Sequence, residues 1–300
     1  MPDTEHSIAF GPYSAIVTER GGALRELRYQ GRDLVVSFGP HGAIPDYRGV
    51  ICAPWPNRLA DGRYAYGGQE FHADINEPER GAALHGFVTG VMWRLLGRSG
   101  HSVTLGSRVE AGRAYPSGLE VAVTYSLSAD GLRGEVRTVN TGRETAPYGI
   151  CPHPYLVAGP SPLDEWTLEL PAGEFMAVSA DRLLPEAMHG VQGHEFDYRI
   201  ARPLGPVRID HAFTGILRDE DGLAAVRVLD PLGTGVELEW DGSWPWVQVH
   251  TADKPTGKDR LGLAVEPMTC PPDAFNSGTD LIHLRPGESH EAGWTIRAFG

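Results

Sequence analysis

Apolar and polar residues alternate over several short stretches of the chain. The clearest of these stretches are residues 119–127, 166–170, 246–251 and 294–299. Alternation with a period of two is typical of a β-strand that buries one face, so each stretch is predicted to be a strand. Residues 226–240 hold two such runs separated by a Pro and Gly turn, which predicts a hairpin. No segment has the periodicity of a helix longer than about three turns.

Turn residues separate these runs along the whole chain. The 38 glycines and 24 prolines are spread between apolar runs and are not gathered into low-complexity tracts. Further hairpin tips are predicted at Gly21-Gly22, Gly67-Gly68 and Asp130-Gly131. Short strands with regular turns, and no amphipathic helices between them, indicate an all-β fold. We therefore predict a large antiparallel β-sandwich.

The chain is expected to fold as one domain, residues 1–300. Its 300 residues, 41% of them hydrophobic, are enough for a large core. No linker, composition shift or internal repeat divides the sequence. Residues 44–63 and 171–208 are polar and lack a regular pattern, so they are predicted to be irregular loops that build a cleft over the sheet.

The charge balance limits the partners. The chain has 26 basic and 39 acidic residues, a net charge of −13, and no cluster of Lys and Arg that would neutralise a run of phosphates. Nucleic acid is therefore excluded as the expected partner. The same acidity disfavours an anionic ligand unless a local cation offsets it.

Cysteine usage and hydropathy indicate a cytoplasmic protein. The three cysteines, Cys52, Cys151 and Cys270, show no paired spacing, so neither a disulfide framework nor a thiolate zinc site is expected. The N-terminal sequence lacks the basic and apolar regions of a signal peptide, and no run of eighteen apolar residues occurs. We therefore expect a protein that is neither secreted nor bound to a membrane.

Common catalytic motifs are missing from the sequence. The twelve histidines include no H-x-H pair and no H-E-x-x-H motif, and His189 and His194 stand five apart in an expected loop, so no metal site is predicted. A G-x-S-x-G elbow, a G-x-x-x-x-G-K-[ST] loop and a G-x-G-x-x-G turn are also missing. Serine hydrolases, P-loop proteins and dinucleotide-binding proteins are therefore not indicated.

The remaining candidates are isolated polar residues in apolar or Pro-rich surroundings. Glu266 is predicted to end an apolar strand just before a proline, where a partly desolvated carboxylate would suit a base. A strand-edge carboxylate is the alternative for Glu266, and a satisfied core histidine is the alternative for His153. Asn57-Arg58 would equally suit a turn with a salt bridge, and Asp210 a turn before His211.

The order of these residues along the chain carries more information than any one of them. The ordered set comprises residues 56–64, 84–87, 153–156 and 210–213, then Gln248, Glu266-Pro267 and residues 284–288. In order and approximate spacing, this set resembles the aldose 1-epimerase (galactose mutarotase) family. The resemblance extends from about Ile8 to the last predicted strand.

The resemblance implies a single large β-sandwich of the galactose mutarotase type with its site in a cleft on one sheet. It implies an isomerase that interconverts the α and β anomers of a free aldohexose, with Glu266 as general base and His153 as general acid. The reaction that the resemblance implies needs no metal, nucleotide cofactor or covalent intermediate. The resemblance gives no role to the neighbouring Trp55 and Tyr155. The positions that it matches to holding the sugar hydroxyls are Asn57, Arg58, His85, Asp210 and Gln248.

Two differences from the family pattern leave the identity of the sugar undetermined. Better-known mutarotases continue after His-Pro-Tyr with Phe and Asn, where this chain has Leu156-Val-Ala, and His250 replaces an aromatic residue that often follows Gln-Val. One alternative is a hexose-6-phosphate 1-epimerase, for which only Arg58 and Arg63 offer cations. Another is a non-catalytic sugar-binding protein, against which the presence of both Glu266 and His153 counts. A glycosidase would need two facing carboxylates.

Overall fold

The computed structural model describes residues 4–253 and 260–300. Its largest sheet has nine strands, in the order β10 (Arg94–Arg98), β11 (Ser102–Val109), β12 (Leu119–Ser128), β13 (Gly131–Asn140), β27 (Ser289–Phe299), β23 (Gly235–Trp240), β22 (Ala224–Leu229), β17 (Thr167–Glu169) and β20 (Arg202–Pro203). A six-stranded sheet has the order β16 (Tyr155–Leu156), β25 (Leu263–Met268), β24 (Trp246–His250), β21 (Asp210–Ile216), β18 (Ala172–Val178) and β19 (Pro185–Gly190).

The third large sheet has four strands, and the remaining strands form two-stranded ladders. A four-stranded sheet contains β1 (Glu5–Phe10), β2 (Tyr13–Thr18), β3 (Ala23–Tyr29) and β4 (Arg32–Asp33). Two-stranded ladders join β5 (Ile51–Cys52) to β15 (Cys151–Pro152), β6 (Arg58–Ala60) to β9 (Ala82–Leu84), β7 (Arg63–Tyr66) to β8 (Gln69–His72), and β14 (Ala146–Tyr148) to β26 (Ile282–Leu284). Helical turns in the described ranges are α1 (Ala274–Ser277) and two 3₁₀ turns, η1 (Pro45–Tyr47) and η2 (Leu163–Glu165).

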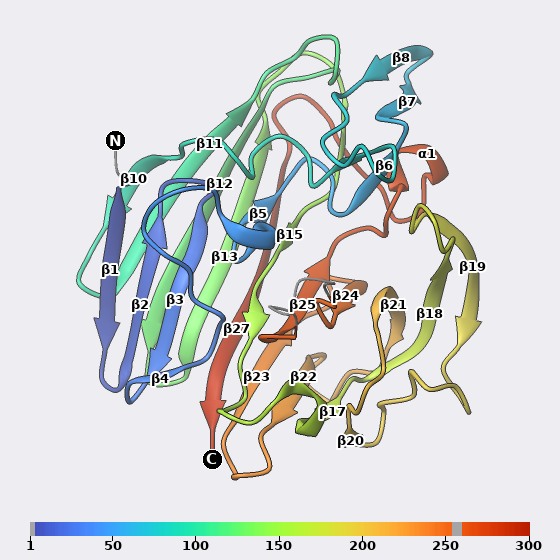
Figure 1. Ribbon diagram of the computed structural model, residues 1–300. Helices are drawn as coiled ribbons and strands as arrows, with labels where there is room; N and C mark the ends of the chain where they lie inside the picture. Colours follow the sequence, from blue (N-terminus) through green and yellow to red (C-terminus); the bar gives the residue numbers. More distant parts are fainter. Residues whose placement is uncertain (1–3, 254–259) are drawn as a thin grey trace.

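The nine-stranded sheet is the broad layer on which the other two large sheets pack (Figure 1). The four-stranded sheet covers β11 and β12, and the Tyr125 hydroxyl donates to the carbonyl of Gly22 at 2.9 Å across the two layers. Further along the same face, Trp244 precedes β24 and donates its indole N–H to the carbonyl of Gly293 in β27. Both tryptophan and tyrosine are buried, so each brings its polar atom to a partner inside the sandwich.

The alternating pattern of the sequence is confirmed as strands. In β12 the residues from Leu119 to Leu127 alternate between buried and more exposed positions, as expected for a strand with one face in the core. The predicted hairpin at 226–240 is β22 and β23, and the three predicted glycine turns connect β2 to β3, β7 to β8 and β12 to β13. Within the described residues, no helix is long and apolar enough to cross a membrane.

The prediction of two irregular loops is wrong in part. Residues 171–208 contain the hairpin of β18 and β19 and the short strand β20, and residues 44–63 contain β5, β6 and η1. The β19 residues are mostly exposed, so the strand has no buried face to produce an alternating pattern. Its pairing comes from backbone hydrogen bonds at the edge of the six-stranded sheet, which side-chain patterns do not reveal.

Candidate active site

Three neighbouring strands of the six-stranded sheet bring polar residues to one place. Gln248 of β24 stands directly opposite Glu266 of β25, so the two side chains lie on the same face of the sheet. Asp210 begins β21, the next strand, and accepts a hydrogen bond of 2.7 Å from Nε2 of Gln248. The amide of Gln248 thus binds Asp210 from the strand between the two carboxyl-bearing strands, and its Oε1 has no partner among the described residues.

Glu266 lies inside its strand and not at its end, which corrects the sequence prediction. It is the fourth of six residues in β25, and only 2% of its surface is exposed. The strand continues through Pro267 because β16 pairs with β25 only as far as Ala264. Beyond Ala264, the strand that pairs with β25 is β24, on one side of it. No strand of the described residues pairs with Pro267 on the other side, so the missing N–H of the proline costs no ladder hydrogen bond there.

His153 faces Glu266 from the segment between β15 and β16. Its Nε2 lies 3.3 Å from Oε1 of Glu266, and both side chains are buried. Aromatic rings enclose the imidazole: Tyr155 stacks on it at 5.4 Å, and His85 meets it edge-on at 4.9 Å. Packing on both sides fixes the ring plane, so Nε2 is held toward the carboxylate.

Two hydrogen bonds join Asn57 and His85, one between their backbones and one from backbone to side chain. The N–H of His85 donates to the carbonyl of Asn57 at 2.9 Å, and the N–H of Asn57 donates to Nδ1 of His85 at 3.2 Å. Both residues have a left-handed backbone, with φ of 54° and 63°. Non-glycine residues adopt this conformation when their surroundings impose it, and such positions concentrate at functional sites.

Arg58 is held by a carboxylate that the sequence analysis did not single out. Its Nε and Nη2 each donate to a different oxygen of Glu77 at 2.8 Å, which is a bidentate pair. Arg80 also approaches Glu77, at 3.3 Å. Glu77 lies in a polar loop, 76–80, where nothing in the sequence distinguishes it from a surface carboxylate.

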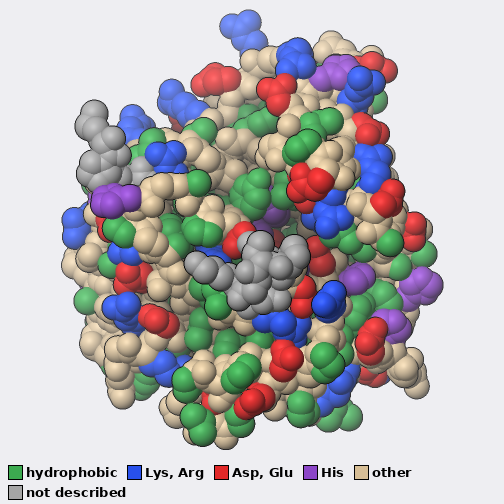
Figure 2. Space-filling view, viewed as in Figure 1, with side chains coloured by type: hydrophobic (Ala, Val, Ile, Leu, Met, Phe, Trp, Pro, Cys, Tyr) green, Lys and Arg blue, Asp and Glu red, His purple; other side chains and the backbone are tan. Residues whose placement is uncertain are grey.

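A cavity of about 420 Å³ joins all of these residues. All seven residues predicted for the site line it, namely Glu266, His153, Asn57, Arg58, His85, Asp210 and Gln248. Lining residues without a predicted role are Asp46, Tyr47, Glu77, Glu79, Arg80, Leu84, Tyr155, His250 and Asp253. Figure 2 shows acidic and basic side chains interspersed over this face and not gathered into a basic patch.

Burial sets the protonation of the central pair. Loss of water lowers the pKa of His153 to about 3. It raises the pKa of the Glu266 carboxyl well above its ordinary value, and the Asp210 carboxylate adds to that rise, whereas Cys151 and Arg58 oppose it. Without a substrate, the lowered pKa of His153 and the raised pKa of Glu266 both place the proton that the pair shares on Glu266 near neutral pH.

A family model described as aldose 1-epimerase matches residues 6–297. The chain belongs to the aldose 1-epimerase family. Among its relatives, the uncharacterized protein YihR of Escherichia coli (strain K12) is 36% identical over 291 residues, which cover 97% of this chain and 92% of YihR. Galactose mutarotase of Mus musculus is 26% identical over 268 residues, which cover 81% of this chain and 76% of the mouse protein.

Solved structures show the fold of this aldose 1-epimerase family member. A GalM/aldose epimerase homologue from C. elegans matches with a TM-score of 0.85 at 20% identity, covering 99% of this chain and 100% of that one. A putative aldose 1-epimerase from Escherichia coli K12 has a TM-score of 0.85 at 23% identity, with 99% of each chain covered. The predicted β-sandwich of the galactose mutarotase type is confirmed.

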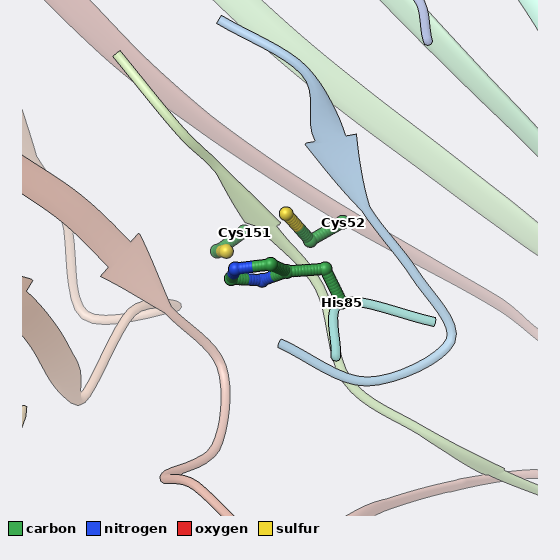
Figure 3. Close-up of side chains that lie close together, drawn as sticks. All are labelled: Cys52, His85 and Cys151. Carbon is green, nitrogen blue, oxygen red and sulfur yellow. The ribbon is translucent and has the colours of Figure 1, made fainter. Parts of the chain in front are cut away.

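Within residues 4–253 and 260–300, two overlapping groups of side chains near the cleft have the residue types that bind metals. The ligand atoms of Cys52, His85 and Cys151 lie within 4.8 Å of one another, as do those of His85, His153 and Glu266. Figure 3 shows the first group, with the His85 ring directed toward the two sulfur atoms.

His85 is unsuited to hold a resident cation in either group. Its Nδ1 accepts the Asn57 N–H, so a neutral imidazole carries its proton on Nε2 and neither nitrogen has a free lone pair. Burial also raises the pKa of both Cys52 and Cys151, so the thiols resist becoming the thiolates that metals need. The absence of a metal requirement stays a prediction.

Three tryptophans take core positions and do not line the cavity. Trp55, Trp244 and Trp246 are at most 4% exposed. The indole of Trp55 donates to the carbonyl of Ala83, and that of Trp246 donates to Asp280. Arg63, the second cation considered for a phosphate, is exposed at the start of β7 and is not part of the cavity wall.

Proposed function

We propose that this protein is an aldose 1-epimerase that interconverts the α and β anomers of a free aldohexose. The observation that carries the proposal is the 3.3 Å contact between Nε2 of His153 and Oε1 of Glu266, buried at the floor of a cavity lined by hydrogen-bonding residues. Anomer exchange must move protons at O1 and at the ring oxygen O5. Both oxygens are bonded to C1, so an acid and a base side by side reach both.

The reaction then follows from the two groups. Glu266 takes the proton of the O1 hydroxyl while His153 gives a proton to O5. The electrons of the O1–H bond form the C1=O1 double bond, and the C1–O5 bond breaks with its electrons on O5. Rotation about C1–C2 turns the aldehyde over, and closure by the reverse steps gives the other anomer. Each positioned group contributes roughly 10² to 10⁴ in rate.

The reactive form requires the proton to move from Glu266 to His153. The two atoms are within reach of a single hydrogen bond, 3.3 Å apart. Arg58 favours the ionised form of Glu266, and sugar hydroxyls that donate to the carboxylate favour it further. Substrate binding therefore produces the carboxylate and imidazolium from a pair that is uncharged in the protein alone.

The other predicted residues are proposed to hold the sugar. His85 carries its proton on Nε2 and donates to a sugar oxygen, and Gln248 accepts from a hydroxyl through its unpartnered Oε1. Asp210 accepts from hydroxyls beside it. Arg58 stabilises charge that develops on the oxygens, and the Asn57 side chain accepts from the N–H of Arg58 at 2.8 Å and so fixes the turn that presents it.

A free sugar suits the charges of the cavity better than a phosphorylated one. Among the described residues, six side chains with a carboxyl group and two arginines, Arg58 and Arg80, line the cavity. Both arginines contact Glu77, so a phosphate would compete with an existing ion pair.

A single domain in the cytoplasm fits the rest of the structure. One buried core cluster contains residues from every large sheet, including Ile8, Val123 and Val265, which supports residues 1–300 as one domain. The three cysteines are free and buried, as suits a reducing compartment.

Polarimetry on purified protein tests the proposal. Freshly dissolved α-glucose and α-galactose, with their 6-phosphates in parallel, should approach anomeric equilibrium faster with enzyme than without it. The Glu266→Gln variant is the control for catalysis by buffer or contaminant. Equal rates with and without the wild-type protein on all four sugars would refute the proposed activity.

A further inference from the structure

The carboxylate of Glu266 is clasped by two residues of one extended segment. Cys151 and His153 are two apart across Pro152, a spacing that places alternate side chains of an extended chain on one face. Sγ of Cys151 lies 3.8 Å from Oε2, and Nε2 of His153 lies 3.3 Å from Oε1. Each oxygen of the carboxylate therefore has its own neighbour.

The two neighbours have different chemical roles. His153 lines the cavity, so Oε1 is the oxygen that reaches the sugar. Cys151 is fully buried and is not part of the cavity wall, so Oε2 points away from the sugar and into the protein. Cys52 is the cross-strand partner of Cys151 in the ladder of β5 and β15, and the two thiols interact. When Cys52 is the donor in that contact, the single S–H of Cys151 is left for Oε2.

We propose that Cys151 is a positioning residue, whose thiol donates to Oε2 of Glu266 and so holds Oε1 toward His153 and the sugar. The thiol is suited to this because burial keeps its pKa well above the ordinary value, so it stays protonated and remains a donor. A thiol is a weak donor, which holds the carboxylate without making it a poor base. The proposal rests on the proposed function, since it assigns a role in that same reaction.

Substitution of Cys151 should change the pH dependence of the reaction. The thiol opposes the rise in the pKa of Glu266, so its loss in Cys151→Ala raises that pKa further and moves the acid limb of kcat/KM to higher pH. Other groups around the carboxyl are unchanged by this substitution. They are His85, His153, Asp210, Arg58, Tyr155 and Cys52.

The test compares three variants with the wild type in kcat, pH profile and thermal melting. Cys151→Ala should lower kcat by about fivefold to twentyfold and shift the acid limb upward by about half a unit to one unit. Cys151→Ser keeps a donor and should recover most of both. Cys270→Ala removes another fully buried thiol, one that packs against Gly149, and should match the wild type in kcat and pH profile while reporting the effect of a core truncation on melting.

An infrared measurement separates this proposal from the proposed function. The S–H stretching band that disappears in Cys151→Ala should shift in frequency in Glu266→Gln, because its acceptor changes from an acid group to an amide. This readout needs no activity, so an inactive wild type would refute the epimerase and leave the contact testable. An unchanged band, a wild-type pH profile in Cys151→Ala, or the same shift in Cys270→Ala would overturn the positioning role.

Discussion

Two contacts between a basic and an acidic side chain have similar geometry and very different surroundings in this protein. Arg137 and Glu291 meet at 2.8 Å on the nine-stranded sheet with 57% and 67% of their side chains exposed. His153 and Glu266 meet at 3.3 Å in the cleft with 6% and 2% exposed. Water screens the first pair, which therefore contributes little. In the second pair, the lack of water moves the pKa of each group by a large amount, and the proposed acid and base chemistry depends on this difference.

The largest expected effect is on catalysis in the cleft. Glu266→Gln and His153→Ala should each lower kcat by at least about a hundredfold with the fold intact, because each removes one proton-transfer partner. Initial rates by polarimetry and melting curves by circular dichroism check this. Either variant with near wild-type kcat and unchanged melting would show that the pair is not the acid and base.

The second largest expected effect is on the stability of the fold. It is tested by comparing an arginine of the cleft with an arginine on the exposed nine-stranded sheet. Arg58→Ala should destabilise the fold by about 2 kcal/mol, because it leaves the largely buried Glu77 without its bidentate partner and with Arg80 as its remaining contact. Arg137→Ala, the matched surface control, should change stability by less than about 0.5 kcal/mol. Urea unfolding measures both. A similar loss in the two variants would contradict the idea that burial and not proximity sets the value of a pair.

Much of this site was predictable from the sequence, and the reasons for the gaps are physical. Glu266 and His153 were predicted because an isolated polar residue in an apolar run is unusual and because their order along the chain resembles a family. Glu77 was missed because its role depends on its contact with Arg58, which lies 19 residues away in the sequence. A carboxylate in a polar loop gives no sequence signal of such a contact. Strand β19 was missed because an exposed edge strand has no alternating pattern. The position of the shared proton depends on burial, which the sequence does not report.

A third effect concerns the charge of the substrate. A free hexose should have a kcat/KM about tenfold higher than its 6-phosphate, because a phosphate must approach a cavity rich in carboxylates. The comparison is made at low and at moderate salt. A phosphosugar advantage that shrinks as salt rises would reveal a basic pocket and replace the free sugar as the proposed substrate.

A fourth effect is the pH dependence of stability. Burial raises the folded-state pKa of Glu266, so its contribution to stability is complete below its unfolded pKa and is lost as pH rises through the folded pKa. The glutamine of Glu266→Gln cannot ionise. The melting temperature of this variant minus that of the wild type should therefore increase by several degrees as pH rises from 5 to 8. Glu291→Gln on the exposed sheet should show no such trend. Parallel curves for both variants would refute the assigned burial effect.

The smallest expected effect is that of metal removal. Treatment with EDTA should leave kcat unchanged, since both nitrogens of His85 are occupied and the proposed reaction needs no Lewis acid. The control is the same enzyme dialysed without chelator. A loss of activity that zinc or manganese restores would show that the buried histidines and cysteines hold an ion after all.

The loop at 76–80 stands apart from the strands that carry Glu266, Gln248 and Asp210. It supplies three charged residues of the cavity wall, Glu77, Glu79 and Arg80, without belonging to either large sheet. If the cavity binds a sugar as proposed, substitution of Glu79 is expected to alter which sugars fit, while Glu77 keeps Arg58 in place and the strands keep Glu266, Gln248 and Asp210 in register. An engineer who wants a new sugar preference should therefore vary Glu79 and leave Glu77 and the strands unchanged.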